Sequence, residues 1–176
     1  MKGTVLYEKI DNIAVLTVDN PPVNPLSDGV RTGLFESITK AEEDDSVEGV
    51  VLTGKGRAFI AGADISEFGG NSDGIGLNEV FNKLEFCKKP LVAAINGIAL
   101  GGGLETALCC NYRIAANSAF VGLPEVNLGL LPGGGGTQRL PRLAGPSDAL
   151  KMMLTGSHIP AKSCLLYTSP SPRDRG

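Results

Sequence analysis

The stretch NGIALGGGLETAL, residues 96–108, passes from an apolar strand-like run through three glycines into a segment that favours a helix. Glycines let the backbone come close to a ligand, and the first amides of a helix lack an intrahelical acceptor and point outward. Glu105 falls in the first turn of this expected helix. On this stretch alone, its carboxylate either complements the helix dipole or takes part in chemistry on a bound ligand.

A second carboxylate, Glu125, lies in the stretch GLPEVNLGLLPGGGG, residues 122–136. It follows Pro124 inside an apolar run from Ala119 to Leu131, which predicts a partly desolvated carboxyl with a raised pKa. The alternative is a glutamate at a loop tip in solvent. Two carboxyl groups that face one cavity can act as base and acid, and nearby glycine amides can stabilise a developing oxyanion.

A third stretch, AFIAGADI at residues 58–65, places small residues at the end of an expected strand. Small side chains leave room for a flat ligand and leave backbone amides accessible. Asp64 is by default a helix cap. Lys55 and Arg57 lie just upstream and either meet phosphate groups or remain solvated surface charges.

Composition excludes several classes of function. A net charge of −3 predicts neither a nucleic-acid nor an anionic-membrane partner, and no apolar run is long enough to span a bilayer. Four cysteines without a C-x-x-C pair, and a single histidine, predict that there is no metal site. The chain starts without a signal-peptide core, so we expect an intracellular protein. Residues 49–55 resemble a P-loop, but Gly56 stands where that loop needs a hydroxyl residue.

Strand-like and helix-like segments alternate along the chain, which predicts an α/β fold. Ser27 is the expected N-cap of the first helix, and NPPVNP at residues 20–25 is expected to form an extended loop. Residues 1–162 are expected to form one domain, and residues 163–176 a disordered tail or a non-native junction. The expected strands are 4–10, 13–20, 49–54, 91–95 and 112–116, and the expected helices are 28–43, 77–87, 101–110, 137–144 and 147–154.

Taken together, these motifs resemble the crotonase (enoyl-CoA hydratase/isomerase) superfamily, from about residue 3 to residue 162. NPPVN and GLPEVNLGLLPG are most similar to the N-terminal hydratase domain of multifunctional β-oxidation enzymes. The resemblance implies an α/β spiral of ββα units that is incomplete at its C-terminal end. The segments that carry it are NPPVN (20–24), GRAFIAGADI (56–65), NGIALGGGLETAL (96–108) and GLPEVNLGLLPGGGGTQRLPRLAG (122–145).

The resemblance also implies roles for particular residues. Glu105 would activate water, and Glu125 would exchange a proton at the substrate's Cα. The backbone amides of Ala63 and Gly102 would hold the thioester oxygen. The other substrate-binding positions that it implies are Lys55, Arg57, Ala61, Gly62, Asp64, Ile65, Gly101, Pro124 and Gly133.

The implied activity is hydration of trans-2-enoyl-CoA to 3-hydroxyacyl-CoA, which the presence of both glutamates favours. A Δ3-Δ2-enoyl-CoA isomerase that uses Glu125 alone, and an inactive truncated fragment that binds acyl-CoA, are the alternatives. Coenzyme A belongs to the acyl-CoA substrate, so no separate cofactor and no metal are implied. The intact relative would be a homo-trimer or hexamer, or would be fused to a 3-hydroxyacyl-CoA dehydrogenase domain. It would lie in the cytoplasm of a bacterium or the peroxisome of a eukaryote.

Overall fold

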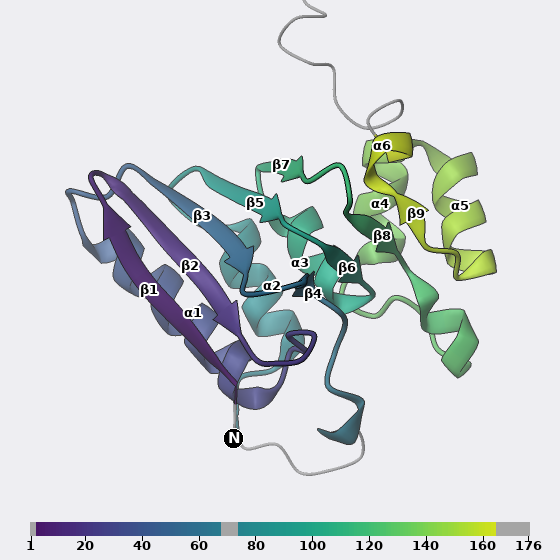
Figure 1. Ribbon diagram of the computed structural model, residues 1–176, viewed down its shortest axis with the longest axis horizontal. Helices are drawn as coiled ribbons and strands as arrows, with labels where there is room; N and C mark the ends of the chain where they lie inside the picture. The colour runs from purple at the N-terminus through teal and green to yellow at the C-terminus, as the bar shows by residue number, and fades with distance from the viewer. Residues whose placement is uncertain (1–2, 68–73, 165–176) are drawn as a thin grey trace, which may run out of the picture.

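The computed structural model describes residues 3–67 and 74–164, and these form a repeated strand–strand–helix pattern (Figure 1). The first unit is β1 (Thr4–Ile10), β2 (Ile13–Asp19) and α1 (Asp28–Glu43). The second is β3 (Gly49–Gly54), β4 (Ala58–Ile60), the 3-10 turn η1 (Ile65–Glu67) and α2 (Leu77–Glu85). The third is β5 (Leu91–Ile95), β6 (Ile98–Leu100) and α3 (Gly102–Cys109). The fourth is β7 (Tyr112–Ala115), β8 (Phe120–Gly122), the 3-10 turn η2 (Pro124–Leu128) and α4 (Gly136–Ala144). After these come α5 (Pro146–Thr155), β9 (Ile159–Pro160) and α6 (Ala161–Cys164).

The strands build two sheets, and the chain visits both in each of the last three units. The larger sheet has the order β1-β2-β3-β5-β7, in which only β1 runs antiparallel to its neighbour. The smaller sheet has the order β4-β6-β8-β9, with β9 antiparallel. Each of these three units therefore adds one strand to each sheet and stacks on the unit before it, whereas the first unit adds both of its strands to the larger sheet. This arrangement confirms the predicted α/β class and the spiral of ββα units.

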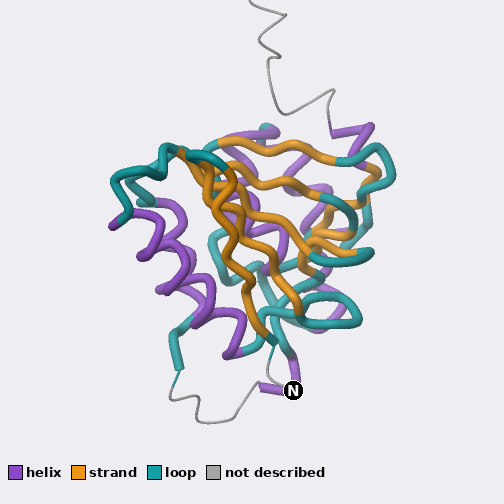
Figure 2. Tube along the Cα trace, turned by 60° about the vertical axis from the view of Figure 1, so that its left-hand side comes forward, coloured by secondary structure: helices purple, strands orange, loops and turns teal. Residues whose placement is uncertain are grey.

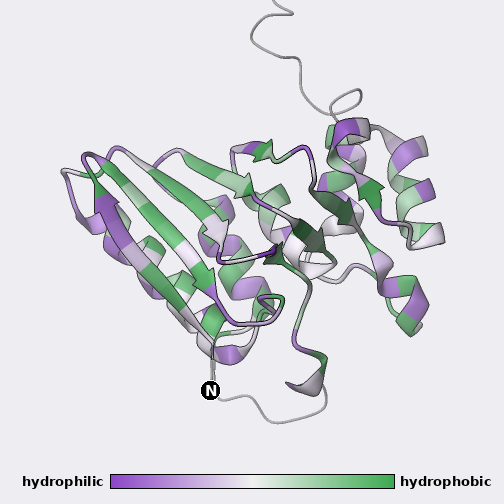
Figure 3. Cartoon of the chain, viewed as in Figure 1, coloured by the Kyte–Doolittle hydropathy of each residue, from purple (hydrophilic) through white to green (hydrophobic). Residues whose placement is uncertain are grey.

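The hydrophobic core lies between the larger sheet and the helices on one of its faces (Figures 1 and 2). Along β2, Leu16 and Val18 have no exposed surface, while the residues between them are partly exposed. Leu34 and Ile38, one helical turn apart on α1, are also fully buried. Apolar residues accordingly dominate the strands of this sheet (Figure 3). Burial of these side chains is the main force that holds each helix on the sheet.

The loop at residues 20–25 differs from the expected extended conformation. The amide of Asn24 donates to the carbonyl of Asn20 at 2.7 Å and closes a turn. The Asn24 side chain then donates to the carbonyls of Ala58 and Lys55, at 2.8 and 3.0 Å. Asn24 has a φ of 56°, a left-handed conformation that asparagine tolerates better than most residues. The prediction of an extended loop was wrong, because the hydrogen bonds of the Asn24 side chain stabilise a tight turn.

Ser27 is the residue before α1, as predicted, but its hydroxyl makes no capping bond. It accepts a hydrogen bond from the side chain of Asn20 at 3.1 Å instead. The strand expected to run into the glycine turn is β6, whereas β8 was not predicted, since three residues carry too little periodicity to be recognised.

The predicted tail begins at residue 163, but α6 continues to Cys164. Residues 165–176 of that tail lie outside the described part of the chain. Within the described residues, none of the helices combines the length and the apolar character that crossing a bilayer requires.

Candidate active site

A glycine turn between β6 and α3 forms the centre of the candidate site. Gly101 adopts a φ of 51° and a ψ of −126°, a backbone conformation that glycine reaches without strain. Its amide donates to the carbonyl of Gly122 at 2.9 Å, which ties the turn to β8. A Cβ on Gly103 would lie 1.8 Å from the carbonyl oxygen of Ile60, so α3 packs directly against the backbone of β4. The glycines therefore bring the first turn of α3 against the end of β4.

This close packing brings the backbone amides of Ala63 and Gly102 together. The amide nitrogen of Ala63 lies 3.4 Å from the position of a Cβ on Gly102. The amide of Leu26 donates to the carbonyl of Gly62 at 2.9 Å and fixes the loop that carries Ala63. Among the described residues, neither the Ala63 nor the Gly102 amide donates a hydrogen bond to a loop or turn acceptor. Two such neighbouring donors are suited to an oxyanion.

Glu105 points from α3 into the protein and is only 3% exposed. One carboxylate oxygen accepts the amide of Gly136 at 2.8 Å, and the other lies 2.5 Å from the position of a Cβ on Gly134. Burial raises the pKa of the Glu105 carboxyl. The Gly136 amide acts against this effect, and the negative charge of Glu125 adds to it. Glu105 is thus a buried carboxyl with one firm amide donor.

Glu125 approaches the same turn from η2. Its Oε1 lies 2.8 Å from the position of a Cβ on Gly101. Its Oε2 is buried and has no hydrogen-bond partner in the described part of the chain. Burial raises the pKa of the Glu125 carboxyl, because an ionised oxygen without a partner is costly to remove from water. The Glu125 carboxyl therefore lies at Gly101, near enough to the Glu105 carboxyl for its charge to raise the pKa of Glu105.

The apolar run from Ala119 to Leu131 predicted a partly desolvated Glu125, and the buried Oε2 confirms this, but the residues after Glu125 are exposed. Leu128 and Leu131 are 60% and 80% exposed, whereas Leu123 is fully buried. The 3-10 turn η2 lies at the surface, and it directs Glu125 inward while the side chains after it point outward. The Glu125 carboxyl therefore lies against the backbone of Gly101, although the residues after it in the sequence are exposed.

The predicted positions beside Ala63 have separate structural roles. Asp64 accepts hydrogen bonds from the amide and hydroxyl of Ser66, at 3.1 and 2.6 Å, and so caps η1. Ile65 is 62% exposed. A cavity of about 210 Å³ opens next to them and is lined by Ala63 and Asp64 together with Arg31 and Leu77. Space for part of a ligand therefore exists beside Ala63.

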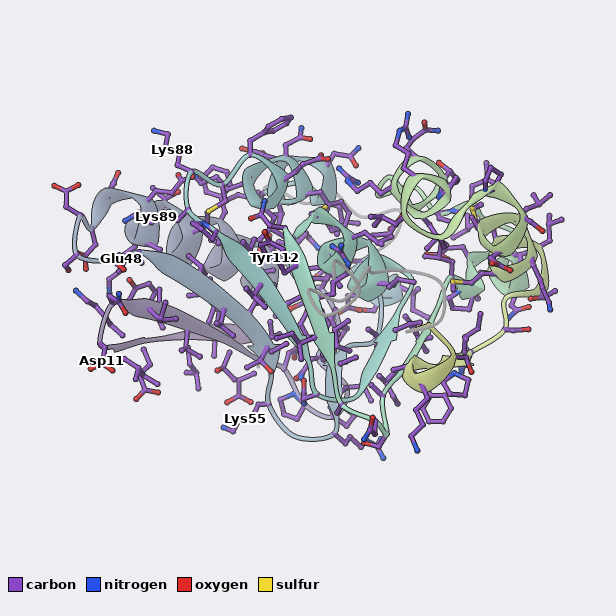
Figure 4. The ribbon with its side chains drawn as sticks, turned by 90° about the horizontal axis from the view of Figure 1, so that it is seen from above. Asp11, Glu48, Lys55, Lys88, Lys89 and Tyr112 are labelled. Atoms are coloured by element: carbon purple, nitrogen blue, oxygen red, sulfur yellow. The ribbon has the colours of Figure 1, made fainter. Side chains whose placement is uncertain are left out.

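The predicted basic residues lie on the turn between β3 and β4. Lys55 forms an ion pair with Asp19 at 2.6 Å, its side chain is 60% exposed, and it projects from the ribbon (Figure 4). Arg57 is also exposed. Ala61 and Gly62 continue from this turn toward the glutamates: the amide of Ala61 donates to Val23, and Gly62 contacts the carbonyl of Leu100.

The glycine run after Glu125 contains contacts that the sequence did not identify. Gly133 was the predicted position, but it is exposed, and the nearest atom to a Cβ there is 3.8 Å away. Gly134 and Gly136 pack on Glu105 instead. Which of these four consecutive glycines faces Glu105 depends on the path of the loop. Within residues 3–67 and 74–164, no group of three potential metal-ligating side chains occurs.

Comparison with known proteins identifies relatives of the whole described region. A model of the enoyl-CoA hydratase/isomerase family matches residues 8–165. A peroxisomal bifunctional enzyme of Danio rerio is 49% identical over 160 residues, which is 90% of this chain and 22% of the relative. A probable enoyl-CoA hydratase of Bacillus subtilis is 46% identical over 87% of this chain and 62% of the relative. The crystal structure of the enoyl-CoA hydratase from Bacillus anthracis is similar, with a TM-score of 0.87, 36% identity, and coverage of 94% of this chain and 67% of that one.

Proposed function

Because this chain belongs to the enoyl-CoA hydratase/isomerase family, we propose that it hydrates trans-2-enoyl-CoA thioesters to 3-hydroxyacyl-CoA, as in fatty-acid β-oxidation. The observation that supports this proposal is the pair of carboxyl groups, Glu105 and Glu125, on either side of the turn that carries the Gly102 amide. Addition of water to a conjugated thioester needs a base, an acid and a site for negative charge, and this turn offers all three.

The different surroundings of the two carboxyl groups suggest which is the base. Glu105 accepts the Gly136 amide, and a hydrogen bond to the charged form favours ionisation. Burial raises the pKa of both carboxyl groups, and the buried Oε2 of Glu125 has no partner of this kind among the described residues. The hydrogen bond is therefore the feature that distinguishes the two groups as base and acid. We therefore assign Glu105 as the base and Glu125 as the acid.

The proposed reaction begins when the Glu105 carboxylate takes a proton from water and the water oxygen bonds to Cβ of the substrate. The π electrons move to the thioester oxygen, where the amides of Ala63 and Gly102 hold the negative charge. The thioester carbonyl then re-forms as Cα takes the proton from Glu125. Each amide donor of such a site contributes about 2–4 kcal/mol to the stability of the transition state.

Replacement of either carboxyl tests these roles. Glu125→Gln should lower kcat for hydration by about 10²–10⁴ and leave the fold intact, because an amide cannot supply the proton. Glu36→Gln is the matched control, since Glu36 is an exposed residue of α1. The assay follows loss of the conjugated enoyl-thioester absorbance together with far-UV circular dichroism. Near-normal hydration by Glu125→Gln would refute the assignment.

The alternative activity is isomerisation of a 3-enoyl-CoA, for which a single carboxyl on Cα suffices. Glu105→Ala separates the two reactions, because it removes the proposed base for water and leaves Glu125 in place. Loss of hydration with retained isomerisation would assign both activities to one site. Binding of acyl-CoA without turnover of either substrate would instead favour the non-catalytic alternative.

The chain covers only part of the length of the relatives that it matches. The chain spans 22% of the Danio rerio relative and 62% of the Bacillus subtilis relative. We propose that Lys55, Arg57 and Ala61 bind the coenzyme A portion of the substrate and that Gly62, Asp64, Ile65, Gly101, Pro124 and Gly133 line the path to the thioester. We further propose that the intact protein assembles as a trimer or hexamer, or continues into a 3-hydroxyacyl-CoA dehydrogenase domain. Its location would be the peroxisome in a eukaryote and the cytoplasm in a bacterium.

A further inference from the structure

The glycine loop that supports Glu105 is itself held on its other side by an arginine. Nη1 of Arg139, on α4, donates to the carbonyl of Gly134 at 2.7 Å. A Cβ on Gly135, whose φ is 95°, would lie 2.0 Å from the same nitrogen. The loop therefore runs between Glu105 and Arg139 with no space for a side chain at Gly135.

Arg139 is in turn anchored to a different helix. Its Nε and Nη2 donate to the two carboxylate oxygens of Glu85, at 3.2 and 2.5 Å. Glu85 is the last residue of α2, and its side chain is 38% exposed, whereas that of Arg139 is 17% exposed. A planar guanidinium that binds a carboxylate through two nitrogens has its orientation fixed. Nη1, the remaining nitrogen of the Arg139 guanidinium, is thus held toward the carbonyl of Gly134.

The opposite side of this loop contacts Glu105. The amide of Gly136 donates to Glu105 Oε1 at 2.8 Å, and Gly134 packs against Oε2. Gly134 also contacts the buried ring of Phe81, which comes from α2 as Glu85 does. The loop is thereby fixed on one side by α2 and Arg139. On its other side, the amide of Gly136 donates to Glu105.

We propose that Arg139 is a positioning residue for Glu105: the Glu85–Arg139 pair clamps the Gly134 carbonyl and so fixes the Gly136 amide that orients the Glu105 carboxylate. Arg139 makes no hydrogen bond to Glu105 in the described structure, and beside its action through the loop its positive charge lowers the pKa of Glu105, an effect that Arg139→Lys keeps. This inference deepens the proposed function and rests on it, since the orientation of Glu105 matters only if this carboxylate reacts. A shift of about 1 Å in a reacting group is enough to lower turnover by about 10²-fold.

The test compares Arg139→Gln and Arg139→Lys with Arg142→Gln. Arg142 is the matched control because it is an exposed arginine on the same helix that bonds only to Gln138 within the described residues. Arg139→Lys keeps the charge but cannot bind Glu85 through two nitrogens and Gly134 through a third. We expect both Arg139 variants to lose about 10-fold or more in kcat, with KM within about twofold of the wild type.

Hydrogen exchange of the Gly136 amide is the second measurement, because it reports on the clamp without any substrate. We expect this amide to exchange about tenfold faster in the Arg139 variants and at the wild-type rate in Arg142→Gln. If Arg139→Gln fails to fold, Glu85→Gln takes its place, because it removes the anchor on α2 and leaves the arginine.

The outcomes separate this inference from the proposed function. Wild-type kcat in Arg139→Lys, or an unchanged exchange rate of the Gly136 amide in the Arg139 variants, would overturn the positioning role. A wild-type protein that does not hydrate enoyl-CoA would instead remove the proposed function. In that case, the exchange rates would still decide whether Arg139 fixes the loop.

Discussion

Replacement of Gly103 by alanine tests the packing on which the candidate site depends. A Cβ at this position would lie 1.8 Å from the carbonyl oxygen of Ile60 and 2.6 Å from its carbon. Both atoms belong to the backbone of β4, so no side chain can rotate away. To restore ordinary van der Waals contact, α3 would have to move back by about 1.6 Å.

The cost of this movement follows from the burial of α3. Every residue of α3 is buried, so the helix cannot withdraw without opening the core around it. Overpacking of a core costs about 1–3 kcal/mol, and a clash between two backbones is at the upper end of that range. A loss of about 3 kcal/mol in the free energy of unfolding lowers Tm by roughly 6–12 °C in a domain of this size.

Thermal and urea unfolding, followed by circular dichroism, measures the effect. Gly133→Ala is the control, because the nearest atom to a Cβ there is 3.8 Å away, and we expect its stability to change by less than about 1 kcal/mol. Gly103→Ala should also separate the Gly102 amide from Ala63, since Gly102 moves with α3. A Tm within about 2 °C of the wild type for Gly103→Ala would show that α3 does not rest on β4 as described.

Two further predictions concern stability. Asn24→Ala should lower the free energy of unfolding by about 2–4 kcal/mol, because it leaves the carbonyls of Ala58 and Lys55 without this donor and places alanine at a φ of 56°. Urea unfolding beside the exposed-site control Asn78→Ala measures this, and equal midpoints for the two variants would contradict it. Burial raises the pKa of Glu125 above its unfolded value, so the contribution of this carboxyl to stability falls as pH rises through the folded pKa. Glu125→Gln should therefore be more stable relative to the wild type at about pH 7 than at about pH 4, and urea titrations that show no such change with pH would contradict the burial of Oε2.

Much of the fold followed from local pattern. The helical periodicity of Val30, Leu34 and Ile38 predicted α1 over its observed range, because each of these side chains meets the core one turn after the last. The glycines before Glu105 predicted the change from strand to helix at Gly101. The short strand β8 escaped prediction, since it is a strand only because its neighbours in the sheet complete its hydrogen bonds.

The candidate site was also only partly predictable, because it depends on contacts between segments that are distant in the sequence. Sequence identified Glu105, Glu125, Ala63 and Gly102 as a set through the family resemblance, and the structure brings them to one turn. It also predicted a desolvated Glu125, which is confirmed, but not that Leu128 and Leu131 of the same apolar run are exposed. The roles of Arg139 and Glu85 were not predictable, because their pairing joins α4 to α2 across 54 positions of the chain.

The amino-acid sequence by itself determined the α/β class, the family, and which residue types are available for proton transfer, because these follow from periodicity and from motifs that are local in the chain. Only the tertiary structure decided which glycine faces Glu105, which oxygen of Glu125 lacks a partner, and which arginine holds the glycine loop that precedes α4. These features depend on contacts between segments that are distant in sequence. Their geometry is set by the packing of backbone against backbone, for which the sequence carries no local signal.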